Sequence, residues 1–168
     1  MKFAKIIFFL FLFFIGCGYK PSSIYQNKIL GNEIKPVISI DIENPRESIF
    51  LKDAVNDAIY TLFGKNVCYQ NCDATMYVKT SFANLTPLDY DENGYPILYR
   101  SKVTLRVTLI DKNGKKRRYS VSGNYDFKIT SDSVLNDQIK FEAYKQASVN
   151  ALNKLIAQIT KDGVKYDN

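Results

Sequence analysis

The chain has 168 residues, the size of one ordinary domain, and carries 23 lysines and arginines against 17 acidic residues. Removal of an export signal of 16 residues, described next, leaves 21 bases against 17 acids, a formal charge of +4 that is too small for a strong nucleic-acid binder. Histidine is absent, which excludes catalytic sites built on a histidine base and removes the commonest ligand of transition metals.

The first 17 residues have the pattern of an export signal. Two lysines precede ten unbroken apolar residues, 6–15, and Gly16 and Cys17 follow. Ten helical residues span about 15 Å, half of a bilayer core of about 30 Å, so we expect a cleaved signal over 1–16 and no spanning helix. The segment Phe14-Ile15-Gly16-Cys17 resembles a bacterial lipobox, which predicts acylation of Cys17 and a membrane-anchored chain. A plain signal peptide and a structural cysteine are the alternatives.

A linker, a strand and a helix are predicted after the anchor. Residues 17–36 hold proline, glycine and serine without a sustained period, as a lipidated linker does. Apolar and polar residues alternate over Val37–Ile42, which predicts the first strand. Over Glu47–Phe63 the apolar residues recur every three or four positions and Gly64 follows, so we expect a helix that packs on a sheet.

Two cysteines follow this helix at close spacing. Only three residues separate Cys68 from Cys72, and in an oxidising periplasm the pair is expected to form a short disulfide loop. Two free thiols are the alternative. A zinc site is excluded, because it needs about four ligands and two cysteines without histidine do not supply them.

A second strand is predicted over Thr75–Leu85. Its two faces would hold Met76, Val78 and Phe82 on one side and Tyr77, Lys79 and Ser81 on the other. The segment Thr86–Pro96 is rich in turn-forming residues and predicts a long, mobile hairpin loop. Its exposed aromatics indicate a protein contact, unless they fold back on the sheet, and its three acids are better explained as a solvated turn than as a catalytic pair.

The clearest strand of the chain covers Ile97–Asp111, where apolar and polar residues alternate almost without error. Its polar face holds Arg100, Lys102, Thr104, Arg106 and Thr108. Asn113-Gly114 is a strong hairpin signal, and a fourth strand returns through residues 119–127. These three strands therefore predict an antiparallel meander with one apolar and one polar face.

A long helix closes the chain. We expect it to run from about Asp132 to Thr160, with an apolar stripe between Val134 and Ile159, Ser131 or Asp132 as the cap and Gly163 as the terminator. The order β-α-β-β-β-α predicts an α+β domain over residues 37–163, followed by a tail, 164–168. In this fold two helices pack on one face of a four-stranded, mainly antiparallel sheet.

No motif for catalysis, a cofactor or a phosphate loop is present, so we expect a protein that is not an enzyme. The remaining chemical signal is a basic strip on the open sheet face and around the last hairpin. It comprises Arg100, Lys102, Arg106, Lys112, Lys115, Lys116, Arg117 and Arg118. Arginine binds phosphates and carboxylates bidentately, which favours an anionic ligand. A wet sheet face also carries such charges for solubility, and that alternative stays open.

The order of elements behind the opening Cys17-Gly18-Tyr19, with a closing helix over 141–159, resembles the LptE family of lipopolysaccharide-assembly lipoproteins. The resemblance implies an outer-membrane lipoprotein that plugs the β-barrel LptD, assists its assembly and helps deliver lipopolysaccharide to the outer leaflet. It also implies that basic residues of the sheet domain bind lipopolysaccharide. Gly18, where an aspartate would signal inner-membrane retention, is consistent with that location. The alternative is a periplasm-facing lipoprotein that serves as an adaptor of another envelope or secretion complex.

Overall fold

The computed structural model describes residues 27, 29–40, 45–111, 113–129 and 135–165. The predicted signal 1–16, Cys17, Lys112, the predicted helix cap at Ser131 or Asp132 and residues 166–168 lie outside the described residues. The elements are β1 (Ile34–Ile40), α3 (Pro45–Phe63), η2 (Gly64–Asn66), β2 (Ala74–Tyr90), β3 (Pro96–Asp111), β4 (Lys116–Lys128) and α4 (Asp137–Val164). The predicted α+β class, with two long helices and four strands in this order, is confirmed.

The four strands form one sheet in the order β1-β2-β3-β4. β1 runs parallel to β2, and the chain crosses between them through α3, whereas β2, β3 and β4 pair as an antiparallel meander. The sheet is therefore mixed. The first strand begins at Ile34, three residues earlier than predicted, because Pro36 is accommodated within a strand that lies at the edge of the sheet.

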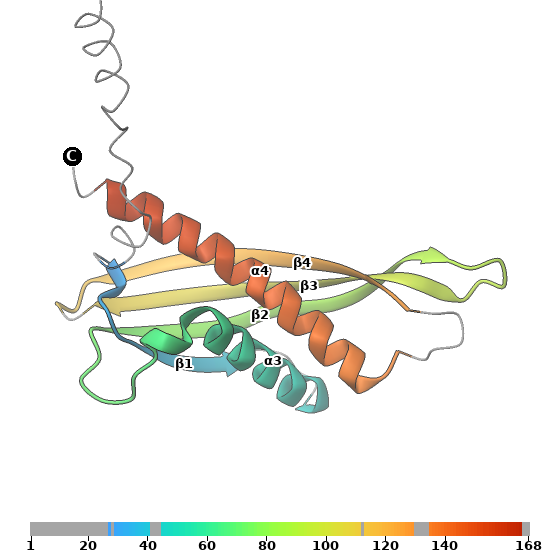
Figure 1. Ribbon diagram of the computed structural model, residues 1–168, viewed down its shortest axis with the longest axis horizontal. Coiled ribbons are helices and arrows are strands. Elements are labelled where there is room, and N and C mark those ends of the chain that lie inside the picture. The colour runs from blue at the N-terminus through green and yellow to red at the C-terminus, as the bar shows by residue number, and fades with distance from the viewer. Residues whose placement is uncertain (1–26, 28, 41–44, 112, 130–134, 166–168) are drawn as a thin grey trace, which may run out of the picture.

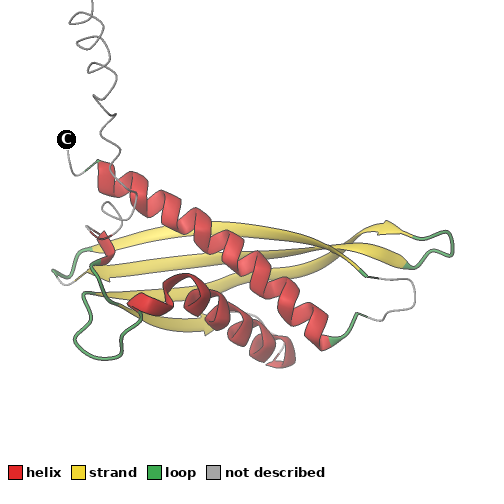
Figure 2. Cartoon of the chain, viewed as in Figure 1, coloured by secondary structure: helices red, strands yellow, loops and turns green. Residues whose placement is uncertain are grey.

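Both long helices lie on the same face of the sheet, α3 over β1 and β2 and α4 across β3 and β4 (Figure 1). The core between the layers is built from alternate strand residues and from the helix faces, including Met76, Leu105, Leu109, Leu152 and Ile159. Figure 2 shows that the β2–β3 hairpin extends beyond the helical layer, and in the described part of the chain neither long helix lies on the opposite face of the sheet. The sheet thus has one covered and one open face.

The predicted boundaries of α4 are wrong at both ends. The cap is Asn136, whose side chain accepts a hydrogen bond from Ile139 N at 2.9 Å. Gly163 is buried inside the helix, which continues to Val164, because burial against neighbouring residues outweighs the weak helix propensity of glycine. α4 therefore measures 28 residues, about 42 Å.

The hairpin between β2 and β3 is tight, so the long loop predicted over Thr86–Pro96 is wrong. β2 continues to Tyr90 and β3 begins at Pro96. Between them, Asp91 Oδ1 accepts hydrogen bonds from Asn93 N at 2.9 Å and Tyr95 N at 2.8 Å. Gly94 has φ +80°, the left-handed region that favours glycine.

The hairpin between β3 and β4 repeats that turn almost atom for atom. Asp111 Oδ1 accepts from Asn113 N at 3.0 Å and Lys115 N at 2.9 Å, and Gly114 has φ +76°. Both turns are Asp-x-Asn-Gly, in which the aspartate fastens the loop and the glycine supplies the positive φ. The hairpin predicted at Asn113-Gly114 is confirmed.

A bulge in β2 reverses which residues face outward. Thr80 pairs with Leu105 and Phe82 with Thr104, so Ser81 is an extra residue on the β2 side. Before the bulge the odd-numbered residues of β2 point to the open face, and after it the even-numbered ones do. The predicted place of Phe82 beside Met76 and Val78 is therefore wrong, and Phe82 is 46% exposed.

The start of the domain lies earlier than the predicted boundary at residue 37. Ile29, Leu30 and Ile34 are buried in the core, although residues 17–36 were expected to form a linker. Their spacing is too short to show an amphipathic period, which is why the pattern alone did not place them. The described residues from Ile29 onward therefore belong to the folded domain.

Both edges of the sheet are partly closed. Ile34 O points away from β2 and accepts a hydrogen bond from Cys68 N at 2.9 Å. Pro36 lies two residues further along β1, so its backbone nitrogen faces the same free edge and has no N–H to offer another strand. At the other edge, α4 donates side-chain hydrogen bonds to β4: Asn150 Nδ2 to Asn124 O at 2.8 Å and Lys154 Nζ to Ser122 O at 2.7 Å.

At Gly123 the backbones of α4 and β4 are in close contact. This residue is buried opposite Val103, and a Cβ built on it would meet the backbone of α4 at Ala147 O and Ala151 N. The helix backbone therefore lies directly on the strand, which only a residue without a side chain permits.

Tyr119 links the start of β4 to the end of α4, and from its raised pKa we expect the protein to lose stability at alkaline pH. Tyr119 Oη donates to Asp162 Oδ2 at 3.1 Å, and burial, followed by this carboxylate, raises the pKa of Tyr119 from 10.0 to about 12. Between pH 10 and 12 the unfolded chain loses the proton and the folded chain keeps it, so stability falls as the pH rises. We expect urea midpoints to fall more steeply between pH 10 and 12 in the wild type than in Tyr119→Phe. The exposed Tyr95→Phe should keep the wild-type slope, and equal slopes in all three proteins would contradict the assignment.

Candidate functional site: the open face of the sheet

The open face carries polar side chains aligned across all four strands. Strand register places Ser39, Lys79, Arg106 and Ser120 in one row, because Ser39 pairs with Lys79, Lys79 with Arg106, and Arg106 with Ser120. Tyr77, Thr108 and Arg118 form the next row. Paired residues lie about 5 Å apart and diagonal neighbours about 7–8 Å, so three cations share one small area. We call Lys79, Arg106 and Arg118 the basic cluster.

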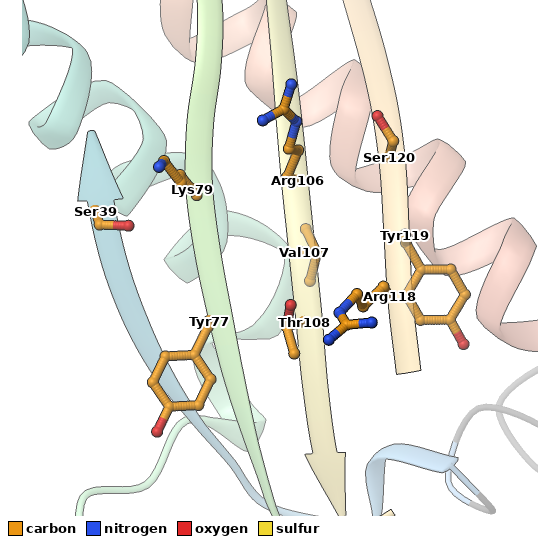
Figure 3. A pocket seen from close by; sticks show the side chains of 9 residues that line it. All are labelled: Ser39, Tyr77, Lys79, Arg106, Val107, Thr108, Arg118, Tyr119 and Ser120. Atoms are coloured by element: carbon orange, nitrogen blue, oxygen red, sulfur yellow. The ribbon is translucent and has the colours of Figure 1, made fainter. Parts of the chain in front are cut away.

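The basic cluster surrounds a hollow of about 510 Å³ on this face. Figure 3 shows Lys79, Arg106 and Arg118 on three adjacent strands, with the Arg118 side chain extending over β3 toward Thr108. Tyr77 lies beside the cluster and is 44% exposed. The hollow thus combines three positive charges, hydroxyl groups and the exposed ring of Tyr77, a combination that fits an anionic ligand with an apolar part.

The two arginines of the basic cluster are available for a ligand. Among the described residues, no carboxylate forms an ion pair with the guanidinium of Arg106 or Arg118. Like charges at this spacing repel each other, and an anion bound between them removes that repulsion. Guanidinium groups donate parallel hydrogen bonds to phosphate, which gives the hollow a chemical preference.

Arg100, at the far end of the predicted strip, is already neutralised. Its Nε and Nη2 atoms donate to the two oxygens of Asp126 at 2.7 and 2.6 Å. These hydrogen bonds raise the pKa of Arg100 and lower the pKa of Asp126. Lys102, the next basic residue along β3, has its Nζ 5.8 Å from the centre of the Phe82 ring. This part of the strip offers less free positive charge than the alternation predicts.

Arg117 does not share the open face with Arg118. Its Nη1 contacts Asp111 Oδ2 at 3.1 Å on the side of the sheet that faces the helices. Burial raises the pKa of Asp111, but hydrogen bonds from Lys115 N, Arg117 and Asn113 N outweigh it and hold that pKa below its usual value. The Arg117 side chain therefore secures the hairpin, while Lys115 and Lys116 are exposed at the hairpin end.

Sequence reasoning missed Lys79 and Tyr77 as site residues. The alternation of the second strand placed both on its polar side, so their direction was visible. The sequence did not show that they lie opposite Arg106 and Thr108, since that position depends on the register between β2 and β3. The Asp-x-Asn-Gly signal at residues 91–94, combined with the bulge, sets that register.

The two cysteines lie in a loop beside β1. Their Cα atoms are 5.9 Å apart, within the range that a disulfide spans, and their sulfur atoms are in contact. Cys68 N also donates to Ile34 O, so this loop covers the beginning of the sheet edge. The arrangement is compatible with the predicted disulfide, which stays a prediction.

In the described ranges, no three histidine, cysteine or acidic side chains gather where they could hold a metal ion. The helices of the same ranges include none that is both long and apolar enough to cross a membrane.

Comparison with known proteins gives a family match and several similar folds. The sequence model of the family described as "LptE: Lipopolysaccharide-assembly" matches residues 36–162, three quarters of the chain. No curated protein matches the sequence.

Among solved structures, a lipoprotein from Caulobacter crescentus has 12% sequence identity and a TM-score of 0.50, and the match covers 86% of this chain and 98% of that one. The rare lipoprotein B from Shewanella oneidensis has 12% identity and a TM-score of 0.49, with 80% of this chain and 99% of that chain covered. At such low identity the first of these likenesses shows a shared fold.

Proposed function

The chain belongs to the LptE family of lipopolysaccharide-assembly proteins, and from this premise we propose that it is an outer-membrane lipoprotein that helps deliver lipopolysaccharide to the outer leaflet. It does so as a plug of an LptD-like β-barrel, whose assembly it also assists. The protein acts by binding and positioning, with no catalytic step and no cofactor. Acylated Cys17 holds it on the periplasmic side of the outer membrane.

The observation that carries the proposal is the basic cluster of Lys79, Arg106 and Arg118 around its hollow. Lipopolysaccharide presents phosphate groups beside acyl chains, so a recognising surface needs cations next to an apolar contact. The cluster supplies the cations, and exposed Tyr77 supplies the apolar contact. Phosphate oxygens bound here would bridge β3 and β4, since Arg106 and Arg118 come from those two strands.

The shape of the domain supports the plug. β2 is 17 residues long, about 55 Å, and its hairpin with β3 reaches beyond the helical layer (Figure 1). At its tip Tyr90 and Tyr95 are 55% and 63% exposed. A rigid hairpin with exposed aromatics is well suited to contact the inner wall of a barrel, where aromatic anchors dominate binding energy.

Co-purification tests this proposal. The full-length tagged protein, extracted from outer membranes in mild detergent, is expected to bring down one large β-barrel protein in near-equal amount. The matched control is a chimaera in which residues 1–26 anchor an unrelated soluble domain to the same membrane. Depletion of the protein should also stop newly made lipopolysaccharide from reaching the cell surface.

Two outcomes would contradict the proposal. Recovery of the same barrel with the chimaera would assign the contact to the anchor segment. Capture of a different complex, together with normal lipopolysaccharide export after depletion, would favour the adaptor of another envelope complex.

A further inference from the structure

The end of the domain from which the anchor segment departs is rich in lysine. The described chain begins at Asn27, which lines a small hollow together with Asn113 of the β3–β4 turn. Ile34, Ala74 and Asp111 lie side by side at this end, because they pair in register. The turn between β3 and β4 and the first described residues of the domain are therefore neighbours.

The end of α4 and the short helix η2 lie at this same end of the domain. The hydrogen bond between Tyr119 and Asp162 puts the end of α4 beside the start of β4. Asn66 Nδ2 donates to Asn32 O at 2.7 Å, which puts η2 beside the residues that precede β1. We call this region the basic end; its exposed lysines are Lys35, Lys65, Lys115, Lys116, Lys161 and Lys165.

The acids of the basic end are mostly engaged. Asp73 Oδ2 accepts from Asn32 N at 2.7 Å, Asp111 pairs with Arg117, and Asp162 binds Tyr119. These three are half-buried, which leaves Glu33 as the exposed acid among the residues named here. The exposed surface of this end is therefore strongly positive.

The opposite end of the molecule has the opposite sign. The stretch 81–99, which forms the outer half of the β2–β3 hairpin, contains Asp89, Asp91 and Glu92 but no lysine or arginine. The two ends are separated by most of the length of β2, about 55 Å, whereas the Debye length at physiological salt is about 8 Å. The acidic tip therefore does not weaken the field at the basic end.

We propose that the basic end rests on the anionic phospholipid headgroups of the membrane that holds the anchor. Cys17 and Asn27 are ten positions apart in the sequence, so the anchor lies at most about 35 Å from the basic end. The inference rests on the lipidation proposed above, which brings this end to a lipid surface. Each lysine near an anionic surface raises the membrane partition about fivefold.

Vesicle flotation of a chain that starts at Gly18 tests this surface without the lipid anchor. All of the described core lies within residues 29–159, so this chain keeps it. We expect binding to vesicles with 30% phosphatidylglycerol, little binding to pure phosphatidylcholine, and loss of binding when NaCl rises from about 0.05 to 0.5 M. Lys115→Glu with Lys116→Glu should lower the partition at least tenfold.

Matched variants decide whether position or total charge matters. Lys52→Glu with Lys128→Glu changes the net charge equally but lies outside the basic end, and its partition should stay within about twofold of the wild type. Lys161→Gln with Lys165→Gln, at the end of α4, should weaken binding as the hairpin variant does, which guards against a local folding defect in either one.

Equal loss in the basic-end and control variants would overturn the proposal, as would binding that ignores phosphatidylglycerol or persists in high salt. Vesicles in which lipopolysaccharide replaces phosphatidylglycerol, if bound through the same lysines while phosphatidylglycerol is not, would also overturn it. The Lys115→Glu, Lys116→Glu variant should still co-purify with the barrel, so this proposal and the proposed function fail separately.

Discussion

Gly123→Ala is expected to lower the free energy of unfolding by about 3 kcal/mol. The new methyl group would occupy the space of Ala147 O and Ala151 N, and it would stand 3.0 Å from the carbonyl carbon of Asn150. These atoms belong to the backbone of α4, which cannot rotate away as a side chain does. The helix must therefore move off β4, and the side-chain hydrogen bonds of Asn150 and Lys154 to that strand would lengthen.

Gly64→Ala is the matched control for this prediction. Gly64 is exposed, and a Cβ built on it has no neighbour within 4 Å. Its stability should change by no more than about 0.5 kcal/mol. Urea denaturation followed by circular dichroism measures both variants, and a Gly123→Ala protein as stable as Gly64→Ala would show that α4 does not lie against β4 as described.

Reversing two charges of the basic cluster should have the largest effect on ligand binding. We expect Arg106→Glu with Arg118→Glu to weaken lipopolysaccharide binding at least about tenfold, because each arginine offers charge-assisted hydrogen bonds to phosphate. Both side chains are exposed on the open face and form no ion pair with a described carboxylate, so the fold should tolerate the change. Titration of the purified protein with lipopolysaccharide in detergent measures the affinity.

Three other variants separate the cluster from charge in general. Lys52→Glu with Lys128→Glu changes the net charge equally at exposed positions outside the basic cluster and should leave the affinity within about twofold. Arg117→Gln should reduce stability through the loss of its pair with Asp111 and leave binding almost unchanged. If Arg100→Gln weakens binding more than the Arg106, Arg118 pair does, the ligand lies farther along β3, beside Asp126.

The central strands could be predicted because their environment is two-sided. β3 has one face against the helices and one face in solvent, so its apolar and polar residues alternate over almost its entire length. The same alternation correctly assigned Arg100, Lys102 and Arg106 to the open face. Binding by those residues remains a proposal, whereas their direction follows from the strand itself.

The failures come from features that the period of a strand does not encode. An extra residue at Ser81 changes the face of everything after it in β2, and it leaves no mark in composition. The repeated Asp-x-Asn-Gly turn was readable at Asp111 and equally present at Asp91, but the surrounding turn-forming residues favoured a long loop. The pairing of Lys79 with Arg106 depends on both the bulge at Ser81 and the turn at Asp91.

The ends of α4 and the start of the domain failed for a different reason. Glycine usually ends a helix, yet Gly163 is buried within one, and Asn136 competes for the cap with Ser131 and Asp132 in the sequence. Tertiary contacts, and not local propensity, decide such boundaries. Ile29 and Leu30 likewise acquire their role only when α3, α4 and the sheet provide a core to enter.

The partly closed edges of the sheet matter for a protein proposed to work beside unfinished β-structure. A barrel under assembly exposes strands with unsatisfied backbone groups, and these add readily to any open sheet. Pro36 offers no donor at one border, and Asn150 and Lys154 occupy carbonyls of β4 at the other. These two borders therefore resist the addition of a foreign strand, whereas residues 81–90 of β2 pair with β3 alone among the described strands, so a strand of the barrel can add to the domain only along the hairpin.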